Sequence, residues 1–249
     1  MPTSVARAKT ALDVQSLRHS CARCSLRQLC LPAGVGAEDL LALEDIVERQ
    51  KPFDKGCFLF RVGDGFENLV VIRSGTVKTF YQGTDGEDQI IGFHFPGDLI
   101  GLDAIHDEQH GCTAQTLERT TVCSFPFSDL QEVAAKIPAL RKQFMRIISR
   151  EILSDQGHLL ALNRKTAQQR LSVFLSSVAQ RFSQRGFSAS DFNLSMSRYD
   201  LANYLGLAVE TVSRLFSGFH AHGILEVERR HVRILDADRL NALCHDNAD

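Results

Sequence analysis

The chain has 249 residues, of which 44% are hydrophobic and 23% charged, a composition typical of a globular protein in water. No uncharged apolar run approaches the roughly 18 residues of a membrane-spanning helix, so we expect no membrane partner. The first twenty residues include Arg7, Lys9 and Arg18 but no continuous apolar stretch. We therefore expect no secretory signal and a cytoplasmic, reducing location, in which disulfides are rare.

The net charge of −2 hides an uneven distribution. Residues 163–235 contain ten Lys and Arg against five acidic residues, a balance of +5. Residues 1–30 contain five against one, a balance of +4. Each basic segment, taken alone, fits either an ordinary solvated face or an anionic partner such as a nucleic acid.

Three of the seven cysteines, Cys21, Cys24 and Cys30, lie within ten residues in the stretch HSCARCSLRQLC. In a reducing compartment such a cluster indicates metal binding or redox chemistry rather than structural disulfides. Iron–sulfur clusters and tetrahedral zinc both normally take four protein ligands, so a fourth ligand must come from elsewhere in the chain. The candidates are Cys57, Cys112, Cys123 and Cys244.

Between Lys51 and Phe127, short runs rich in β-branched and aromatic residues alternate with glycine turns. This spacing predicts an antiparallel jelly roll, a sensor domain over residues 35–137. Glycine tolerates a positive φ and aspartate can bond its own backbone, so both suit tight turns. The predicted turns are Gly63-Asp64, Ser74-Gly75, Asp85-Gly86 and Gly97-Asp98.

After Pro138 the spacing becomes helical and predicts one long dimerisation helix over residues 138–163. Its seam has the alternating intervals of three and four that a two-helix coiled coil shows. The seam consists of Met145, Ile148, Ile152, Asp155, Leu159 and Leu162. Two symmetry-related Asp155 carboxylates about 5 Å apart repel by on the order of 3 kcal/mol at an effective dielectric of 20, so we expect a weak homodimer. The alternative is a stripe that packs on the chain's own barrel.

Residues 164–249 carry the pattern of a winged helix-turn-helix, with a turn at Gly206 and a hairpin led by Gly223. The positions spaced to pack its two helices are Leu201, Ala202, Leu205, Val209, Val212 and Leu215. The outward face of the second helix, which can read base edges in the major groove, carries Glu210, Thr211, Ser213 and Arg214. The alternative is a helix pair with a merely charged surface. With a cysteine-bearing segment over 1–34, the predicted fold class is α+β.

In this order, the cysteine segment, barrel, long helix and winged helix resemble the cyclic-AMP receptor superfamily. More narrowly, the chain resembles the fumarate and nitrate reduction regulators, the oxygen-sensing iron–sulfur branch of that superfamily. The resemblance covers nearly the whole chain. It is carried by the motifs CxxCSxxxLC, GDxxGxDAI, VCxxPF, SDQ, RFxQRGFS and YLGLxVETxSRL.

The resemblance implies a 4Fe-4S cluster that oxygen converts towards 2Fe-2S. The implied ligands are Cys21, Cys24, Cys30 and Cys123. Cys112 is the chief rival of Cys123 for the fourth position. Four thiolates make the whole group anionic, which gives an electrostatic reason for the nearby Arg18, Arg23 and Arg27.

The resemblance further implies a homodimer that forms when the cluster is bound and separates into monomers in oxygen. Such a dimer is expected to bind an inverted repeat resembling TTGAT...ATCAA in double-stranded DNA, with base contacts from Glu210, Ser213 and Arg214. RNA polymerase is an expected second partner. The positions that match polymerase-contacting surfaces of the family are Arg73, Ser74, Gly86 and Ser188.

The superfamily's cyclic nucleotide site has a glutamate for the ribose and an arginine-serine pair for the phosphate. Leu102, Cys112 and Thr113 stand at those positions here. The phosphate clamp is missing, so the resemblance to this branch implies no cyclic AMP.

Two other hypotheses remain open at this point. A zinc- or thiol-based switch on the same DNA-binding scaffold needs only the same cysteines. A cupin-type enzyme is suggested by His94, His106 and His110, but its usual metal site has two histidines one residue apart, and the barrel segment has no such pair. We therefore expect no catalytic residues. We interpret Cys57 as a buried hydrophobe and Cys244 as a tail thiol.

Overall fold

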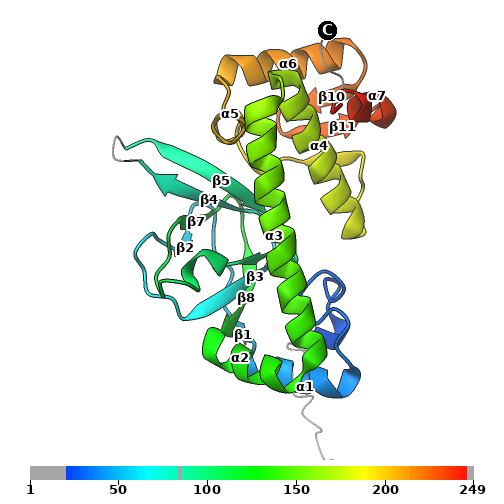
Figure 1. Cartoon of the computed structure of the whole chain (residues 1–249). Coiled ribbons are helices and arrows are strands. Elements are labelled where there is room, and N and C mark those ends of the chain that lie inside the picture. The colour runs from blue at the N-terminus through cyan, green and yellow to red at the C-terminus, as the bar shows by residue number, and fades with distance from the viewer. Residues whose placement is uncertain (1–20, 84–85, 246–249) are drawn as a thin grey trace, which may run out of the picture.

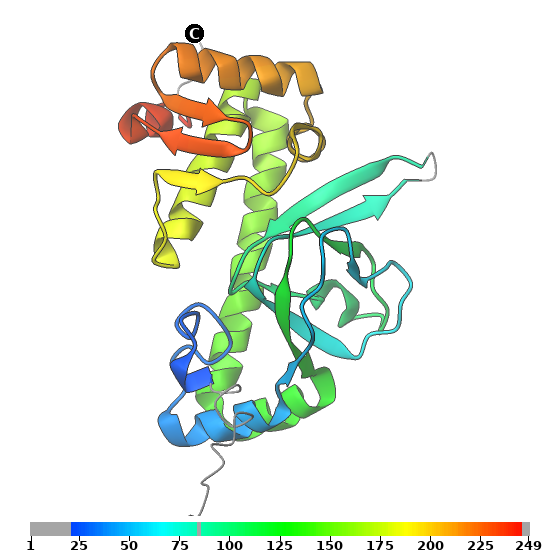
Figure 2. The same ribbon diagram turned by 180° about the vertical axis from the view of Figure 1, so that it is seen from behind.

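The computed structural model describes residues 21–83 and 86–245 and confirms an α+β chain, built along one long helix, α3 (Pro138–Arg164). Figures 1 and 2 show α3 running through the length of the molecule, with the barrel on one side. The cysteine segment and α1 (Ala37–Ile46) lie beside its N-terminal half, and the winged helix lies at its other end. The interpretations that involve Arg7, Lys9, Arg18 and Asp85 fall outside the described residues.

Within the described residues, eight strands form the predicted jelly roll as two four-stranded antiparallel sheets, ordered β1-β8-β3-β6 and β2-β7-β4-β5. Their bounds are β1 (Glu48–Arg49), β2 (Phe58–Phe60), β3 (Asn68–Ser74), β4 (Val77–Gln82), β5 (Asp88–His94), β6 (Leu99–Ile100), β7 (Thr113–Thr116) and β8 (Thr121–Pro126). Buried apolar side chains from facing sheets, such as Ile72 and Val77, fill the interior. Burying these side chains is the main stabilising contribution to the barrel.

The turns of the barrel use glycine and aspartate as expected. Gly63 and Gly97 adopt φ of +85° and +92°, values that glycine reaches without the steric cost of a Cβ. The aspartate that follows each glycine accepts a hydrogen bond from the backbone N–H three residues earlier. Arg61 N is 2.7 Å from Asp64 Oδ2, and Phe95 N is 2.8 Å from Asp98 Oδ2.

The helical half contains more elements than the sequence pattern predicts. The remaining elements are α2 (Phe127–Lys136), α4 (Ala167–Gln184), β9 (Asp191–Asn193), α5 (Arg198–Leu205), α6 (Val209–Ala221), β10 (Leu225–Glu228), β11 (His231–Ile234), α7 (Ala237–Ala242) and the short 3-10 turns Cys21–Arg23 and Leu102–Ala104. The break between α3 and α4 is a capping box: Thr166 Oγ1 accepts from Gln169 N at 3.3 Å, and Gln169 Oε1 accepts from Thr166 N at 2.8 Å.

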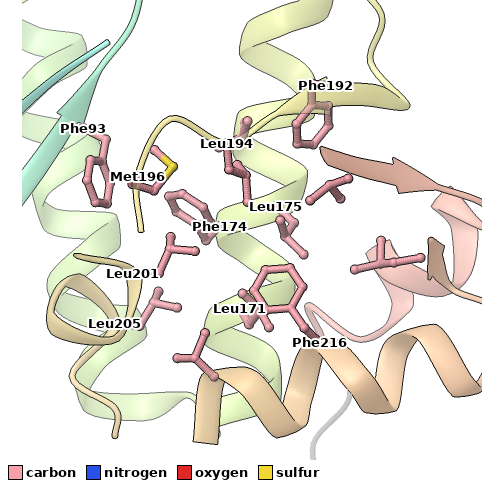
Figure 3. Close-up of a cluster of buried hydrophobic side chains, with 14 of the residues drawn as sticks. Phe93, Leu171, Phe174, Leu175, Phe192, Leu194, Met196, Leu201, Leu205 and Phe216 are labelled. Atoms are coloured by element: carbon pink, nitrogen blue, oxygen red, sulfur yellow. The ribbon is translucent and has the colours of Figure 1, made fainter. Parts of the chain in front are cut away.

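One hydrophobic core joins the barrel to the winged helix. Figure 3 shows its members converging from α4, α5, α6 and the strand that carries Phe93. The ring centroid of Phe93 lies 6.0 Å from that of Phe174 on α4 and 5.0 Å from that of Tyr204 on α5. Aromatic pairs at these distances add to the stabilisation from burial, so the winged helix is docked on the outer face of β4 and β5.

We predict that Gly75→Ala destabilises the barrel by about 3 kcal/mol, because Gly75 combines a positive φ with a close approach. Its φ is +89°, and an added Cβ would meet Thr120 Oγ1, and also Arg119 O at 2.8 Å and Thr120 Cα at 2.9 Å. Gly86 is the matched control, since its φ is +82° and, among the described residues beyond its chain neighbours, no atom lies within 4 Å of an added Cβ. Gly86→Ala should cost only about 1 kcal/mol. Equal losses in urea unfolding of the two variants would contradict the close approach.

Candidate cysteine centre and nucleic-acid interface

The cysteine segment is a compact series of turns. Cys24 N donates to Cys21 O at 3.2 Å, and Cys30 N donates to Leu26 O at 3.0 Å. Cys21 and Cys30 are buried, and Cys24 is half-buried. The local turns therefore direct three thiols inward from a segment only ten residues long.

Cys123 enters the same region from the barrel. It lies on β8, where it pairs with Arg49 of β1 and Val71 of β3. Cys123 packs half-buried against the hydrophobic cluster that contains Cys21 and Cys30, so the two segments bring these thiols together. The structure thus brings the four predicted ligands into one region. Cys112 lies elsewhere, with its Sγ 3.4 Å from Asp103 Oδ2.

Burial of these thiols opposes their ionisation. Burial, together with Cys123, Glu44 and Cys24, raises the pKa of Cys21 to about 11. Burial also raises the pKa of Cys30 and of Cys123. Without a bound metal, neutral thiols are therefore the stable form, and metal binding must displace their protons.

Arginines in the same segments provide the positive charge that a group with four thiolates needs. Arg49 lowers the pKa of Cys123 through its charge and a hydrogen bond, against the larger effect of burial. The buried Nε atoms of Arg49 and Arg27 have no hydrogen-bond acceptor among the described residues. Buried N–H groups without acceptors are rare, and for Arg49, whose charge acts on Cys123, anionic sulfur would supply an acceptor. The donor set and its surroundings thus fit an anionic metal–thiolate group.

Within the described residues, no three His, Cys, Asp or Glu side chains are arranged to hold one metal ion. In a cluster with four irons each cysteine binds a different iron. The ligands of such a cluster therefore stand farther apart than the ligands around one tetrahedral ion.

The cysteine segment is joined directly to the N-terminal half of α3. Buried Gln143 donates from Nε2 to Cys30 O at 3.2 Å. Cys21 and Cys30 share a hydrophobic cluster with Leu140 and Ile147 of the same helix. The cysteine segment and α3 therefore share one packed interface.

Further along, α3 presents an uncovered apolar stripe. Met145, Ile152 and Leu159 of the predicted seam are 59%, 50% and 58% exposed, and Asp155 is exposed among them. The other two seam residues, Ile148 and Leu162, are half-buried. Ile148 faces the barrel across a shared cavity, whereas Leu162 lies beside Gly206 of the helix-turn-helix. The alternative of packing on the barrel therefore holds in part for Ile148 alone among the seam residues.

The sequence pattern missed two residues of this stripe. Leu153 and Leu160 are 65% and 61% exposed. They lie one position after Ile152 and Leu159, so a seven-residue repeat wider than the narrow seam would have included them.

A cavity of about 470 Å³ lies between the barrel and α3. Leu102 and Cys112, two of the three positions expected to hold a cyclic nucleotide, line it. The third, Thr113, is buried and accepts a hydrogen bond from Val62 N at 3.2 Å. Carboxyl groups also line the cavity, namely Asp103, Glu151 and Asp155.

In the helix-turn-helix, the predicted packing positions meet as expected. Leu201, Ala202, Leu205 and Val212 are buried, and Val209 and Leu215 pack against them half-buried. Gly206 ends α5 with φ 62° and ψ 44°, the left-handed conformation that redirects the chain into α6. The wing is the antiparallel pair β10–β11, extended by β9.

The outward face of α6 is free to approach a groove. Glu210, Ser213 and Arg214 are exposed and Thr211 is half-buried. Ser217, one turn further on, is also exposed; its helical spacing from Ser213 and Arg214 was a signal that the sequence analysis did not use. Polar and basic side chains on one face of such a helix are what major-groove recognition needs.

The positions matched to polymerase contacts are all exposed: Arg73, Ser74, Gly86 and Ser188. Ser74 Oγ lies 2.7 Å from Thr121 Oγ1 at the end of β8.

The barrel histidines form no pair of ligands. His94 is buried with Nε2 2.9 Å from Thr79 Oγ1, and His110 is buried and stacked on Phe60. The sequence does contain a His-x-His pair, His220 and His222, but it lies where α6 ends, outside the barrel.

Two interpretations of single cysteines were wrong. Cys57 is half-buried rather than fully buried, because it lies in a turn before β2. Cys244 is not a loose tail thiol: it is 7% exposed, and its carbonyl accepts from Lys165 Nζ at 2.7 Å. Helix α7, which the sequence pattern did not predict, docks on α4 and carries Cys244 into the core.

None of the helices among the described residues combines the length and the apolar character needed to cross a membrane.

Comparison with known proteins places these features in a family. Residues 50–136 match the cyclic nucleotide-binding domain, and residues 169–243 match the Crp-like helix-turn-helix domain. The structure of FixK2 from Bradyrhizobium japonicum superposes with a TM-score of 0.74 and 29% identity, covering 82% of this chain and 100% of that one.

Similarity to named regulators extends over almost the full chain. Transcriptional activator protein Anr of Pseudomonas protegens is 50% identical over 90% of this chain and 91% of its own length. The fumarate and nitrate reduction regulatory protein of Salmonella typhimurium is 45% identical over 90% of this chain and 89% of its own length. The relatives are transcription regulators rather than enzymes. The chain therefore belongs to the family of Crp-like transcription regulators that includes Anr and the fumarate and nitrate reduction regulatory protein.

Proposed function

We propose that this regulator responds to oxygen through a 4Fe-4S cluster held by Cys21, Cys24, Cys30 and Cys123, and binds DNA as a dimer when oxygen is absent. The observation that carries the proposal is the convergence of these four thiols on a region that packs against α3. When bound, the cluster supplies an oxygen-labile link between the cysteine segment and the barrel.

The protein's own residues prepare this site for a negatively charged group. The thiols are buried, so each must lose its proton on binding. Arg27 and Arg49 each bring a buried N–H group that has no acceptor in the part of the chain the structure describes, and hydrogen bonds to thiolate sulfur are a known means of tuning such centres. Oxygen that converts the cluster towards 2Fe-2S would leave Cys123 and the cysteine segment less firmly joined.

The response reaches the dimer seam through α3. Gln143 and Ile147 contact the cysteine segment, and the apolar stripe begins at Met145 on the same helix. Asp155 opposes association because two copies of its carboxylate meet across the seam. Moving such an equilibrium from 1:99 to 99:1 takes roughly 5.5 kcal/mol, a shift within the range of a few metal–ligand bonds.

Dimerisation is what makes DNA binding specific. Two copies of α6 about one helical turn apart can read an inverted repeat such as TTGAT...ATCAA, and a monomer reads only half of it. Base contacts are assigned to Glu210, Thr211, Ser213 and Arg214. The exposed surface with Arg73, Ser74, Gly86 and Ser188 is left for RNA polymerase.

Cyclic AMP is not the proposed effector. A phosphate needs an arginine or similar donors, but Cys112 and Thr113 stand at the two positions of the phosphate clamp. Asp103, Glu151 and Asp155 line the cavity with one arginine, Arg181, and that arginine is already paired with Asp98.

An anaerobic visible spectrum with iron and sulfide counts tests the cofactor. We expect about four irons and four acid-labile sulfides per chain, with absorbance that fades in air. The Cys123→Ser variant should bind neither the iron nor the sulfide, whereas Cys112→Ser, the matched control, should bind both. A colourless protein with one zinc and no sulfide would replace this proposal by a zinc switch on the same scaffold.

Asp155→Ala should permit dimerisation in air. Removing about 3 kcal/mol of repulsion raises the association constant by on the order of 100-fold. Sedimentation velocity measures this shift, with Gln156→Ala, exposed one position along the helix, as the control. A variant that stays monomeric in air would show that Asp155 does not lie in the seam.

Arg214→Ala should weaken binding by about 1 to 3 kcal/mol and relax discrimination at one base pair per half-site. Anaerobic affinities for operators changed at one pair at a time measure this. A uniform loss on every sequence would instead make Arg214 a phosphate contact.

A further inference from the structure

One carboxylate, Asp98, joins the barrel to the winged-helix domain. Arg181 Nη1 lies 2.9 Å from its Oδ2, and Arg185 Nη2 lies 2.8 Å from its Oδ1. Both arginines belong to the C-terminal end of α4 or the residue that follows it. Charge-assisted hydrogen bonds of this kind are the strong ones, and here two of them meet on one side chain.

The arginines are held so that they face Asp98. The side chain of Arg185 is only 5% exposed, and that of Arg181 is 28% exposed. Arg185 also donates from Nε to Pro96 O and from Nη1 to Arg181 O, the latter at 2.6 Å. Among the described residues, Asp98 is the one carboxylate that forms an ion pair with either arginine. Without its charge, two guanidinium groups would face each other partly buried.

The other side of the same turn contacts the cysteine segment. Gly97 has no side chain, and a Cβ added there would lie 3.1 Å from Leu29 Cβ. Leu29 immediately precedes Cys30. A small cavity of about 60 Å³ is lined jointly by Leu29, Asp98, Arg181 and Arg185, together with Glu151 of α3. The cysteine segment, the barrel, α3 and α4 therefore meet at this turn.

We propose that Asp98 is a positioning residue that passes the state of the cysteine segment to the DNA-binding domain, by a route separate from the dimer seam. Leu29 packs against the turn at Gly97, and Asp98 forms ion pairs with Arg181 and Arg185 at the end of α4. When the cysteine segment becomes ordered, the end of α4 becomes ordered with it. Because α4 packs against α6, this sets the position of α6 relative to the barrel. This inference rests on the proposed cluster.

The test variant is Asp98→Asn, which keeps the shape of the side chain and removes its charge. Asp64→Asn is the matched control: Asp64 also follows a glycine with positive φ and accepts from the N–H three residues earlier, yet it forms no ion pair within the described chain. Hydrogen–deuterium exchange is followed in segments 21–31 and 178–186, in cluster-free protein and after anaerobic reconstitution. DNA affinity, sedimentation and thermal unfolding are measured on the same samples.

In the unmodified chain and in Asp64→Asn, reconstitution should slow exchange in both segments. In Asp98→Asn it should slow exchange only in 21–31, and the gain in DNA affinity on reconstitution should fall about tenfold while the dimer still forms. Slowed exchange in 178–186 of Asp98→Asn, or an equal loss in Asp64→Asn, would overturn the assignment. If segment 21–31 of the unmodified chain is unaffected and no iron or sulfide is bound, the cluster proposal itself fails and takes this one with it.

Discussion

The packing of the cysteine segment against the N-terminal half of α3 is the contact that links the thiols to the rest of the structure. Gln143 bonds the Cys30 carbonyl, and Leu140 and Ile147 share a core with Cys21 and Cys30. The same helix then leaves an apolar stripe uncovered, with a charged Asp155 within it. One helix thus carries both a buried contact with the cysteine segment and an exposed apolar surface with a carboxyl group within it.

The fold of the barrel suggests nucleotide binding, but its contacts indicate a structural role. Its interior is filled by apolar side chains, and the cavity between it and α3 has three carboxyl side chains and one arginine, Arg181, among its lining residues. What the barrel contributes is a frame: β8 presents Cys123, the outer face of β4 and β5 carries the winged helix, and the Gly97-Asp98 turn contacts two other segments. The barrel keeps the family fold, and its contacts with the cysteine segment and the winged helix distinguish its role from that of a nucleotide-binding domain.

Local patterns predicted most of the architecture, and long-range contacts explain what they missed. Glycine turns and β-branched runs indicated the jelly roll, and the spacing around Gly206 indicated the helix-turn-helix. Strand β1 has only two residues, so no pattern could place Arg49 opposite Cys123. The Thr166-x-x-Gln169 capping box can be recognised in the sequence, and it marks the break between α3 and α4. The Asp98 turn was predicted, but its arginines come from α4, and the burial of Cys244 follows from the docking of α7; both are set by tertiary packing alone.

Sedimentation velocity on one preparation, first under argon and then after exposure to air, measures whether oxygen separates the two chains. We expect a particle of twice the 27.7 kDa chain mass under argon and a single chain in air, with the change following the loss of iron and sulfide. Identical masses under both gases, with unchanged affinity for the inverted repeat, would contradict this expectation.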